Sequence, residues 1–153
     1  MKQIASFSVN HDKLNRGVYV SRIDGDAVTY DIRMKKPNNN SYITPKALHT
    51  IEHLLATYVR NSEYSESIIY AGPMGCRTGF YLVARENIVK ENILKLLSGA
   101  FAYIADFEGE IPGSKRIECG NYLEHDLASA KQEAEEFLAV LKNITADKMN
   151  YEE

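Results

Sequence analysis

The chain has 153 residues and a net charge of −3 at pH 7, and it is 44% hydrophobic and 25% charged, as expected of one globular domain spanning 1–153. Lys and Arg are scattered and the longest basic stretch is Lys35-Lys36, so nucleic acid is not an expected partner. No signal-peptide-like run and no stretch of roughly 20 apolar residues occurs, so we expect a cytoplasmic protein with no membrane partner.

Two β-strands joined by a tight turn are expected in the first part of the chain. They cover Val18–Ile23 and Ala27–Lys35, and Asp24-Gly25-Asp26 supplies the turn between them. Further along, Thr44-Pro45 has the pattern of a helix N-cap followed by proline in the first helical position. A helix is therefore predicted from Pro45 to about Arg60.

The second half of the chain predicts two more strands and two more helices. The strands are Glu66–Tyr70 and Thr78–Ala84, separated by a glycine-rich turn over 72–76. The helices are Ile88–Asp106 and Asp126–Leu141, in which apolar residues recur at helical spacing. Because strands and helices do not alternate regularly, the expected fold is α+β, a largely antiparallel sheet with helices packed on one face.

The first predicted helix contains the segment His49-Thr50-Ile51-Glu52-His53. His49 and His53 are one turn apart and face the same way, so both imidazoles can reach one metal ion. Glu52 lies on the flank of that face, within reach of a metal-bound water or a substrate. The rest of the helix is apolar nearly all round, which predicts burial. Buried polar groups need partners, and this spacing favours a metal over mutual hydrogen bonding.

Three residues outside this helix are candidates for the metal ligands beyond His49 and His53. Cys119 suits a borderline-soft ion such as zinc or ferrous iron, and three protein ligands would leave one position open for catalysis. Glu124 would instead match the inverted zinc peptidases, although a single domain leaves little room for a peptide cleft. His125, six residues past Cys119, could close a purely structural zinc site as a fourth ligand.

The chain has two cysteines, and Cys76 lies in a different sequence setting from Cys119. Cys76 lies on the glycine-rich turn and is followed by Arg77, a cation that would favour the thiolate. The alternative is that both thiols are inert, with Cys76 serving as a small residue in a tight turn. The turn alone does not decide between a reactive and an inert thiol.

Six segments, taken in order, carry a resemblance to a known family. They are Ser6-Phe7, Asp31-Ile32-Arg33, His49-Thr50-Ile51-Glu52-His53-Leu54, Pro73-Met74-Gly75-Cys76-Arg77-Thr78-Gly79-Phe80-Tyr81, Cys119-Gly120 and His125-Asp126-Leu127. Together they resemble the S-ribosylhomocysteine lyases, the LuxS family. The helix segment alone is a weak signal, but its combination with Pro-Met-Gly-Cys and Cys-Gly at these spacings is highly specific. Two positions depart from the family's pattern, Asn10 and Tyr70, where an acidic residue is usual.

The resemblance implies an activity and a partner. It implies a carbon–sulfur lyase that cleaves S-ribosylhomocysteine to homocysteine and 4,5-dihydroxy-2,3-pentanedione, the autoinducer precursor of quorum sensing. It implies a homodimer with two active sites at the subunit interface. It also implies one divalent metal per subunit, ferrous iron in the native enzyme and replaceable by zinc or cobalt.

The resemblance also assigns roles to residues of this chain. The metal ligands would be His49, His53 and Cys119. The thiolate of Cys76 and the carboxylate of Glu52 would transfer protons. The substrate pocket would be lined by Ser6, His11 and Arg33, and Arg33 would also hold Cys76 as the thiolate.

Overall fold

An antiparallel sheet carries the core in the computed structural model, which describes residues 1–152. The strands are β1 (Gly17–Asp24), β2 (Ala27–Arg33), β3 (Ile68–Pro73) and β4 (Gly79–Arg85); the helices are α1 (Ala5–Ser8), α2 (Pro45–Arg60), α3 (Lys90–Asp106) and α4 (Leu127–Leu141), with short 3₁₀ turns at Ser65–Ser67 and Ala146–Lys148. The four strands run in the order β1-β2-β4-β3, and every neighbouring pair is antiparallel.

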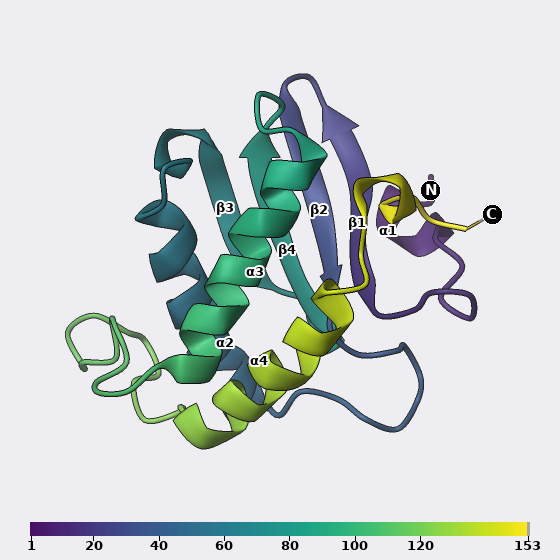
Figure 1. The fold of residues 1–153 in the computed structure, drawn as a ribbon. Helices are drawn as coiled ribbons and strands as arrows, with labels where there is room; N and C mark the ends of the chain where they lie inside the picture. The colour runs from purple at the N-terminus through teal and green to yellow at the C-terminus, as the bar shows by residue number, and fades with distance from the viewer. Residues whose placement is uncertain (153) are drawn as a thin grey trace.

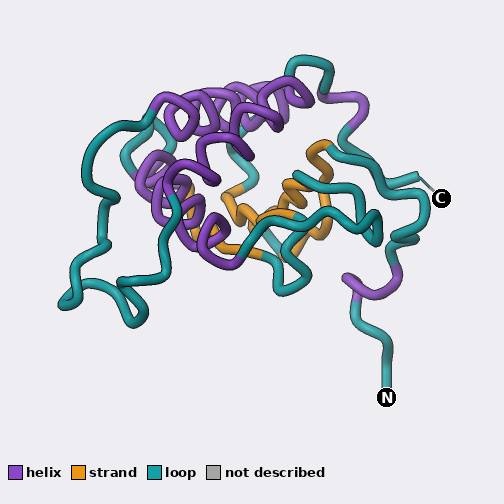
Figure 2. Tube along the Cα trace, turned by 90° about the horizontal axis from the view of Figure 1, so that it is seen from below, coloured by secondary structure: helices purple, strands orange, loops and turns teal. Residues whose placement is uncertain are grey.

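Helices α2, α3 and α4 lie on one face of this sheet (Figure 1), and the view turned by 90° shows the helical layer and the strand layer separately (Figure 2). Side chains of a strand alternate between faces, so Tyr30 and Ile32 of β2 enter the core with the helices. Asp31 and Arg33 therefore point to the opposite face, away from the helices. The predicted α+β fold, with its antiparallel sheet and helices on one face, is confirmed.

Local capping chemistry explains where two of the helices begin. Thr44 is the N-cap of α2, its hydroxyl accepts a hydrogen bond from the Ala47 amide at 3.3 Å, and Pro45 occupies the first helical position. Asp126 caps α4 in the same way, accepting from the Ser129 amide at 3.0 Å. Among residues 1–152, no helix has the length and apolarity that a membrane crossing requires.

The boundaries of β3 differ from the sequence prediction. The strand was expected over Glu66–Tyr70, but Ser65–Ser67 form a 3₁₀ turn and β3 runs from Ile68 to Pro73. Pro73 was expected in the following turn and instead pairs with Phe80 of β4. A proline is tolerated there because β3 is the edge strand of the sheet.

Two further boundaries were also predicted too generously. Strand β2 ends at Arg33 rather than at Lys35. Helix α3 begins at Lys90 rather than at Ile88, because Val89 has an extended backbone (ψ 153°) and serves as its N-cap. Both differences lie within two or three residues of the element ends, and neither moves a candidate site residue.

The C-terminal segment lies beside β1, at the edge of the sheet away from β3 (Figure 1). The Val20 amide donates to the Met149 carbonyl at 2.8 Å, and the Met149 side chain is fully buried. The ring of Tyr151 stacks on Tyr19 with a centroid separation of 5.1 Å. This arrangement brings Tyr151 to the sheet face that carries Asp31 and Arg33.

Candidate functional site

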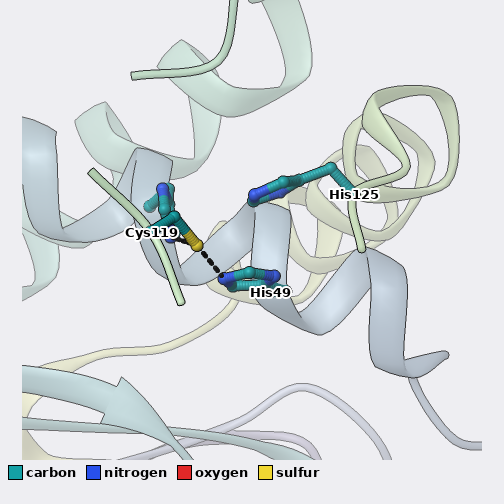
Figure 3. A group of neighbouring side chains, drawn as sticks. His49, Cys119 and His125 are labelled. Atoms are coloured by element: carbon teal, nitrogen blue, oxygen red, sulfur yellow. Dashed lines mark hydrogen bonds between the residues drawn. The ribbon is translucent and has the colours of Figure 1, made fainter. Parts of the chain in front are cut away.

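Three of the predicted ligands converge between α2 and the segment that joins α3 to α4 (Figure 3). His49 and His53 project from one face of α2, and their ring centroids are 4.6 Å apart. The Sγ of Cys119 is 3.5 Å from Nε2 of His49 and 4.0 Å from Nε2 of His53. Together with His125, these residues offer four donor atoms that all lie within 4.8 Å of one another.

Backbone carbonyls fix the orientation and the tautomer of both helix histidines. Nδ1 of His49 is 2.7 Å from the Glu124 carbonyl oxygen, and Nδ1 of His53 is 2.8 Å from the Pro112 carbonyl oxygen. A carbonyl can only accept, so each Nδ1 carries the proton and donates it. In the tautomer that this hydrogen bond selects, the Nε2 lone pair of each ring is turned toward Cys119, as in metal-binding histidines.

The spacing of these donor atoms fits a tetrahedral ion. Bond lengths of about 2.3 Å to sulfur and about 2.05 Å to nitrogen place tetrahedral S and N ligands about 3.5 Å apart. The Cys119–His49 separation of 3.5 Å matches that value, and the Cys119–His53 separation of 4.0 Å exceeds it by half an ångström. A borderline-soft divalent cation suits this set of one sulfur and two imidazoles.

His125 is the fourth member of the cluster, and its ring stacks on His49 with centroids 4.1 Å apart. Its Nε2 is buried without a hydrogen-bond partner among residues 1–152. Burial, followed by the proximity of His49 and His53, lowers the pKa of His125 to about 4, so the ring is neutral at pH 7. It binds a metal only if Nδ1 donates to Thr50 Oγ1, 3.0 Å away, because Nε2 is then bare.

Glu52 lies beside the cluster and not in it. Its half-buried side chain lines a hollow of about 370 Å³ together with His53, Tyr70, Pro112 and Gly113. It is absent from the donor cluster, and among residues 1–152 no hydrogen bond or ion pair engages its carboxylate. A carboxylate in that position is available for proton transfer next to a metal.

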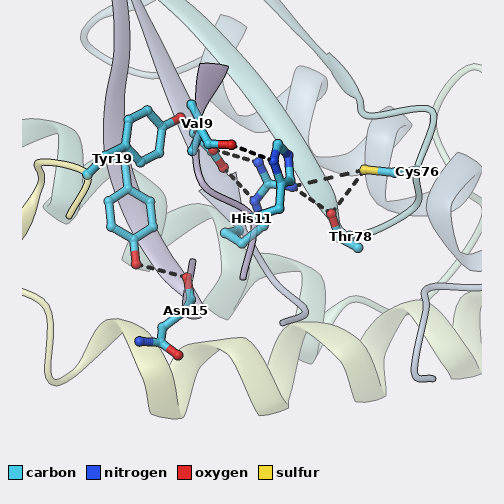
Figure 4. A network of polar contacts seen from close by, with 9 residues as sticks. Val9, His11, Asn15, Tyr19, Cys76 and Thr78 are labelled. Carbon is cyan, nitrogen blue, oxygen red and sulfur yellow. Dashed lines mark hydrogen bonds and ion pairs between the residues drawn. The ribbon is translucent and has the colours of Figure 1, made fainter. Parts of the chain in front are cut away.

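Cys76 belongs to a second polar group on the opposite side of the sheet from the helices (Figure 4). Its Sγ is exposed, 3.1 Å from Thr78 Oγ1 and 4.0 Å from Nη1 of Arg33. The same Nη1 donates to Thr78 Oγ1 at 2.7 Å, so this hydroxyl accepts from Arg33 and its own hydrogen is free to point at sulfur. Cys76 Sγ can therefore accept from both Thr78 Oγ1 and Arg33 Nη1, which are the contacts that a thiolate would make.

The structure does not bring the two groups together within one chain. Across residues 1–152, no hydrogen bond or ion pair joins the cluster of His49, His53 and Cys119 to Cys76 or Arg33. Ser6 is half-buried in the four-residue helix α1, and His11 contacts the Val9 carbonyl at 2.9 Å. Neither residue contacts the metal-ligand cluster.

Comparisons with known proteins identify the family. The sequence profile of S-Ribosylhomocysteinase (LuxS) matches residues 4–148. The chain belongs to this family. It is 50% identical to an S-ribosylhomocysteine lyase of Phocaeicola vulgatus, and the alignment covers 99% of this chain and 98% of that one. It is 49% identical to proteins of the same name from Clostridium acetobutylicum, with both chains covered fully, and Porphyromonas gingivalis, with 99% of each chain covered.

Membership in the LuxS family confirms the resemblance that the six sequence segments carried, and the geometry decides against the inverted zinc peptidase alternative. That alternative needed Glu124 as a ligand. The Glu124 carboxylate instead accepts from Asn121 Nδ2, and only its backbone carbonyl reaches the cluster, as the acceptor for His49. The donor set therefore differs from that of the peptidases.

Sequence reasoning missed several residues around the LuxS site. Thr78 and Asp31 hold Arg33, Tyr151 reaches Asp31 from the C-terminal segment, and Thr50 contacts His125. Thr50, Thr78 and Asp31 each lie within two residues of a predicted site residue. All three also lie in the segments that carry the family resemblance, so these two features of the sequence could have indicated them.

Proposed function

We propose that this chain is a metal-dependent S-ribosylhomocysteine lyase that releases homocysteine and 4,5-dihydroxy-2,3-pentanedione. The observation that carries the proposal is the convergence of His49, His53 and Cys119 at tetrahedral spacing in a chain of this family. The relatives from Phocaeicola and Clostridium are lyases of this name over their full lengths. The same coverage supports a single lyase domain over 1–153.

The reaction requires a carbonyl to move along the sugar before sulfur can leave. The opened ribose has its aldehyde at one end and the carbon–sulfur bond at the other, so two enolisations must carry the carbonyl inward before β-elimination. A bound divalent ion supplies a Lewis acid for the oxygen charge that develops in these steps. The remaining requirement is a pair of groups that remove and return protons.

Cys76 and Glu52 are the groups that we propose for this proton transfer. Arg33 Nη1 lies 4.0 Å from Cys76 Sγ, and the Thr78 hydroxyl, 3.1 Å away, can donate to the same sulfur; both groups would stabilise a thiolate acting as a base. Glu52 lines the hollow next to His53, and its carboxylate, which has no hydrogen-bond partner among residues 1–152, would face a substrate bound there. Ser6, His11 and Arg33 are proposed to bind the substrate.

For the ion itself we propose ferrous iron, with zinc or cobalt able to replace it. Two imidazoles and one thiolate suit all three of these ions, and the Nδ1 hydrogen bonds of both histidines leave Nε2 as the atom that would bind any of them. One ion per subunit follows from the single four-residue cluster found among residues 1–152.

We further propose a homodimer whose two active sites lie at the subunit interface. Cys76 and the metal ligands make no direct contact within one chain, so a partner subunit can supply the missing half of each site. Large apolar side chains are exposed next to proposed site residues: Phe7, which follows Ser6, is 69% exposed, and Ile117 and Leu123, on either side of Cys119 in the sequence, are 93% and 75% exposed. Exposed apolar groups of this size favour a protein interface.

Mixing two inactive variants tests the shared site. Cys76→Ala and His53→Ala subunits are denatured, mixed and refolded together with metal, and each variant is also refolded alone. All samples are assayed for thiol release from S-ribosylhomocysteine. If each site combines the two subunits, half of the refolded dimers are mixed and each has one intact site, giving about a quarter of wild-type activity. Wild-type protein refolded alone is the control. Activity no higher than that of either variant alone would show that one chain provides the whole site.

A structural zinc site remains the competing function, and His125 is the observation that favours it. With His125 as the fourth ligand the ion would be closed to substrate. The absorption spectrum of the cobalt-loaded protein distinguishes the two. An open site changes its spectrum when an exogenous ligand such as azide or the substrate displaces water, whereas a site closed by four protein ligands does not.

A further inference from the structure

A continuous chain of polar contacts links the C-terminal segment to Cys76 (Figure 4). The Tyr151 hydroxyl donates to Asp31 Oδ2 at 2.6 Å. Arg33 grips the same carboxylate with two donors, Nε to Oδ1 at 3.1 Å and Nη2 to Oδ2 at 2.7 Å. The remaining nitrogen, Nη1, donates to Thr78 at 2.7 Å and lies 4.0 Å from Cys76 Sγ. One guanidinium therefore connects Asp31 to the thiol.

The central ion pair is buried, which makes its geometry depend on each partner. Asp31 is 0% exposed and Arg33 is 3% exposed. A buried carboxylate needs its oxygens fully engaged, because neither oxygen can turn to water without cost. Oδ2 accepts two of the three hydrogen bonds, one from Arg33 and one from Tyr151. The phenol thus supplies the third hydrogen bond to the carboxylate that orients Arg33.

Tyr151 is itself held firmly enough to act in this way. Its ring stacks on Tyr19 at 5.1 Å, and two residues earlier the buried Met149 accepts the hydrogen bond from Val20. Burial, followed by the nearby Asp31 carboxylate, raises the pKa of Tyr151 well above its ordinary value. The phenol therefore keeps its proton and remains a donor to Asp31 throughout the physiological pH range.

We propose that Tyr151 is a positioning residue for Cys76, acting through Asp31 and Arg33. The inference rests on the proposed function only in giving Cys76 a chemical role. Without the phenol hydrogen bond, Asp31 Oδ2 loses one of its two donors and carries more unneutralised charge. The guanidinium of Arg33 is then drawn toward Asp31 and its field at Sγ weakens, which lowers the reactivity of Cys76.

The test is the rate at which Cys76 reacts with iodoacetamide at neutral pH, followed by peptide mass spectrometry in metal-loaded protein without substrate. Tyr151→Phe removes one oxygen and keeps the stacked ring. We expect its Cys76 to react roughly three- to tenfold more slowly than wild type, the size of coupling usual within one hydrogen-bond network. Tyr19→Phe is the matched control: it keeps the stack, loses a hydroxyl bonded to the Asn15 carbonyl, and should react at the wild-type rate.

A second variant guards against an indirect effect of the phenylalanine. A chain ending at Asn150 removes Tyr151 altogether, retains Met149 and should slow the reaction of Cys76 at least as much. Equal rates in wild type, Tyr151→Phe and the shortened chain would overturn the proposal. Alkylation needs no substrate, so this outcome is distinguishable from a failure of the proposed lyase activity. In that second case no thiol is released from S-ribosylhomocysteine, while Cys76 of Tyr151→Phe still reacts more slowly than Cys76 of the wild type.

Discussion

Replacing Cys119 with alanine removes the sulfur donor from the cluster and leaves only the imidazoles of His49, His53 and His125. Loss of an outer-shell partner of a metal ligand typically weakens binding about 10- to 100-fold. Cys119 is proposed as a ligand itself and lies 3.5 Å from Nε2 of His49, so we expect the metal dissociation constant to rise by more than about 100-fold. That factor corresponds to about 2.7 kcal/mol.

The loss of affinity should also appear as a loss of stability. Free metal at 100 times its dissociation constant stabilises the wild type by about 2.7 kcal/mol, whereas the same concentration stabilises a 100-fold weaker variant by about 0.4 kcal/mol. The difference of about 2.3 kcal/mol corresponds to a lower Tm by about 5 to 9 °C in a domain of this size. Cys76→Ala is the matched control, because Cys76 lies outside the cluster and should leave both quantities unchanged.

Competition with a chromogenic chelator measures the dissociation constants, and thermal melts at fixed free zinc measure the stability. In the cobalt-loaded protein, the sulfur-to-metal charge-transfer band should vanish in Cys119→Ala and persist in Cys76→Ala. Glu124→Gln would separate the ligand alternatives further and should keep the metal. Normal affinity and an intact charge-transfer band in Cys119→Ala would refute the ligand assignment.

Three further predictions follow from the described geometry. Gly79→Ala should lower the free energy of unfolding by about 3 kcal/mol in urea titrations, because an added Cβ would lie 1.9 Å from the Ile32 carbonyl oxygen; Gly75→Ala, with open space around it, should be near neutral. Glu52→Gln should retain the metal but lower kcat for homocysteine release roughly 10²- to 10⁴-fold, because its carboxylate is assigned to proton transfer. In urea titrations above pH 10, the free energy of unfolding should fall more steeply with pH in the wild type than in Tyr151→Phe. Because the pKa of Tyr151 is raised in the native state, the native protein keeps this proton after the unfolded chain has released it. The stability that the proton contributes below about pH 10 is therefore lost as pH rises.

The parts of the fold that the sequence predicted well are those governed by local chemistry. Thr44-Pro45 and Asp126 start their helices through hydrogen bonds to residues three positions later, which are visible in the sequence. The ends of β3 depend instead on pairing with β4, and that pairing admits Pro73 into the strand. A prediction from local propensity does not include the pairing with β4.

The same distinction applies to the site. The spacing of His49 and His53 is local, so a metal site could be predicted from α2 alone. The choice of Cys119 over Glu124 concerns residues about 70 positions away, and the family resemblance made that choice possible. The carbonyls of Pro112 and Glu124 that orient the two histidines have no sequence signature, because every residue has a carbonyl group. Tyr151 reaches Asp31 across 120 positions.

The direct test of the proposed lyase is the product balance with S-ribosylhomocysteine as substrate. Anaerobically purified, ferrous-loaded protein is incubated with substrate, homocysteine is titrated as free thiol, and the dicarbonyl product is trapped with an aromatic diamine and identified by mass spectrometry. The account predicts equal amounts of homocysteine and trapped pentanedione, formed by the wild type and not by Cys76→Ala. Fully metal-loaded wild-type protein that releases no thiol, or that releases thiol without the dicarbonyl product, would contradict it.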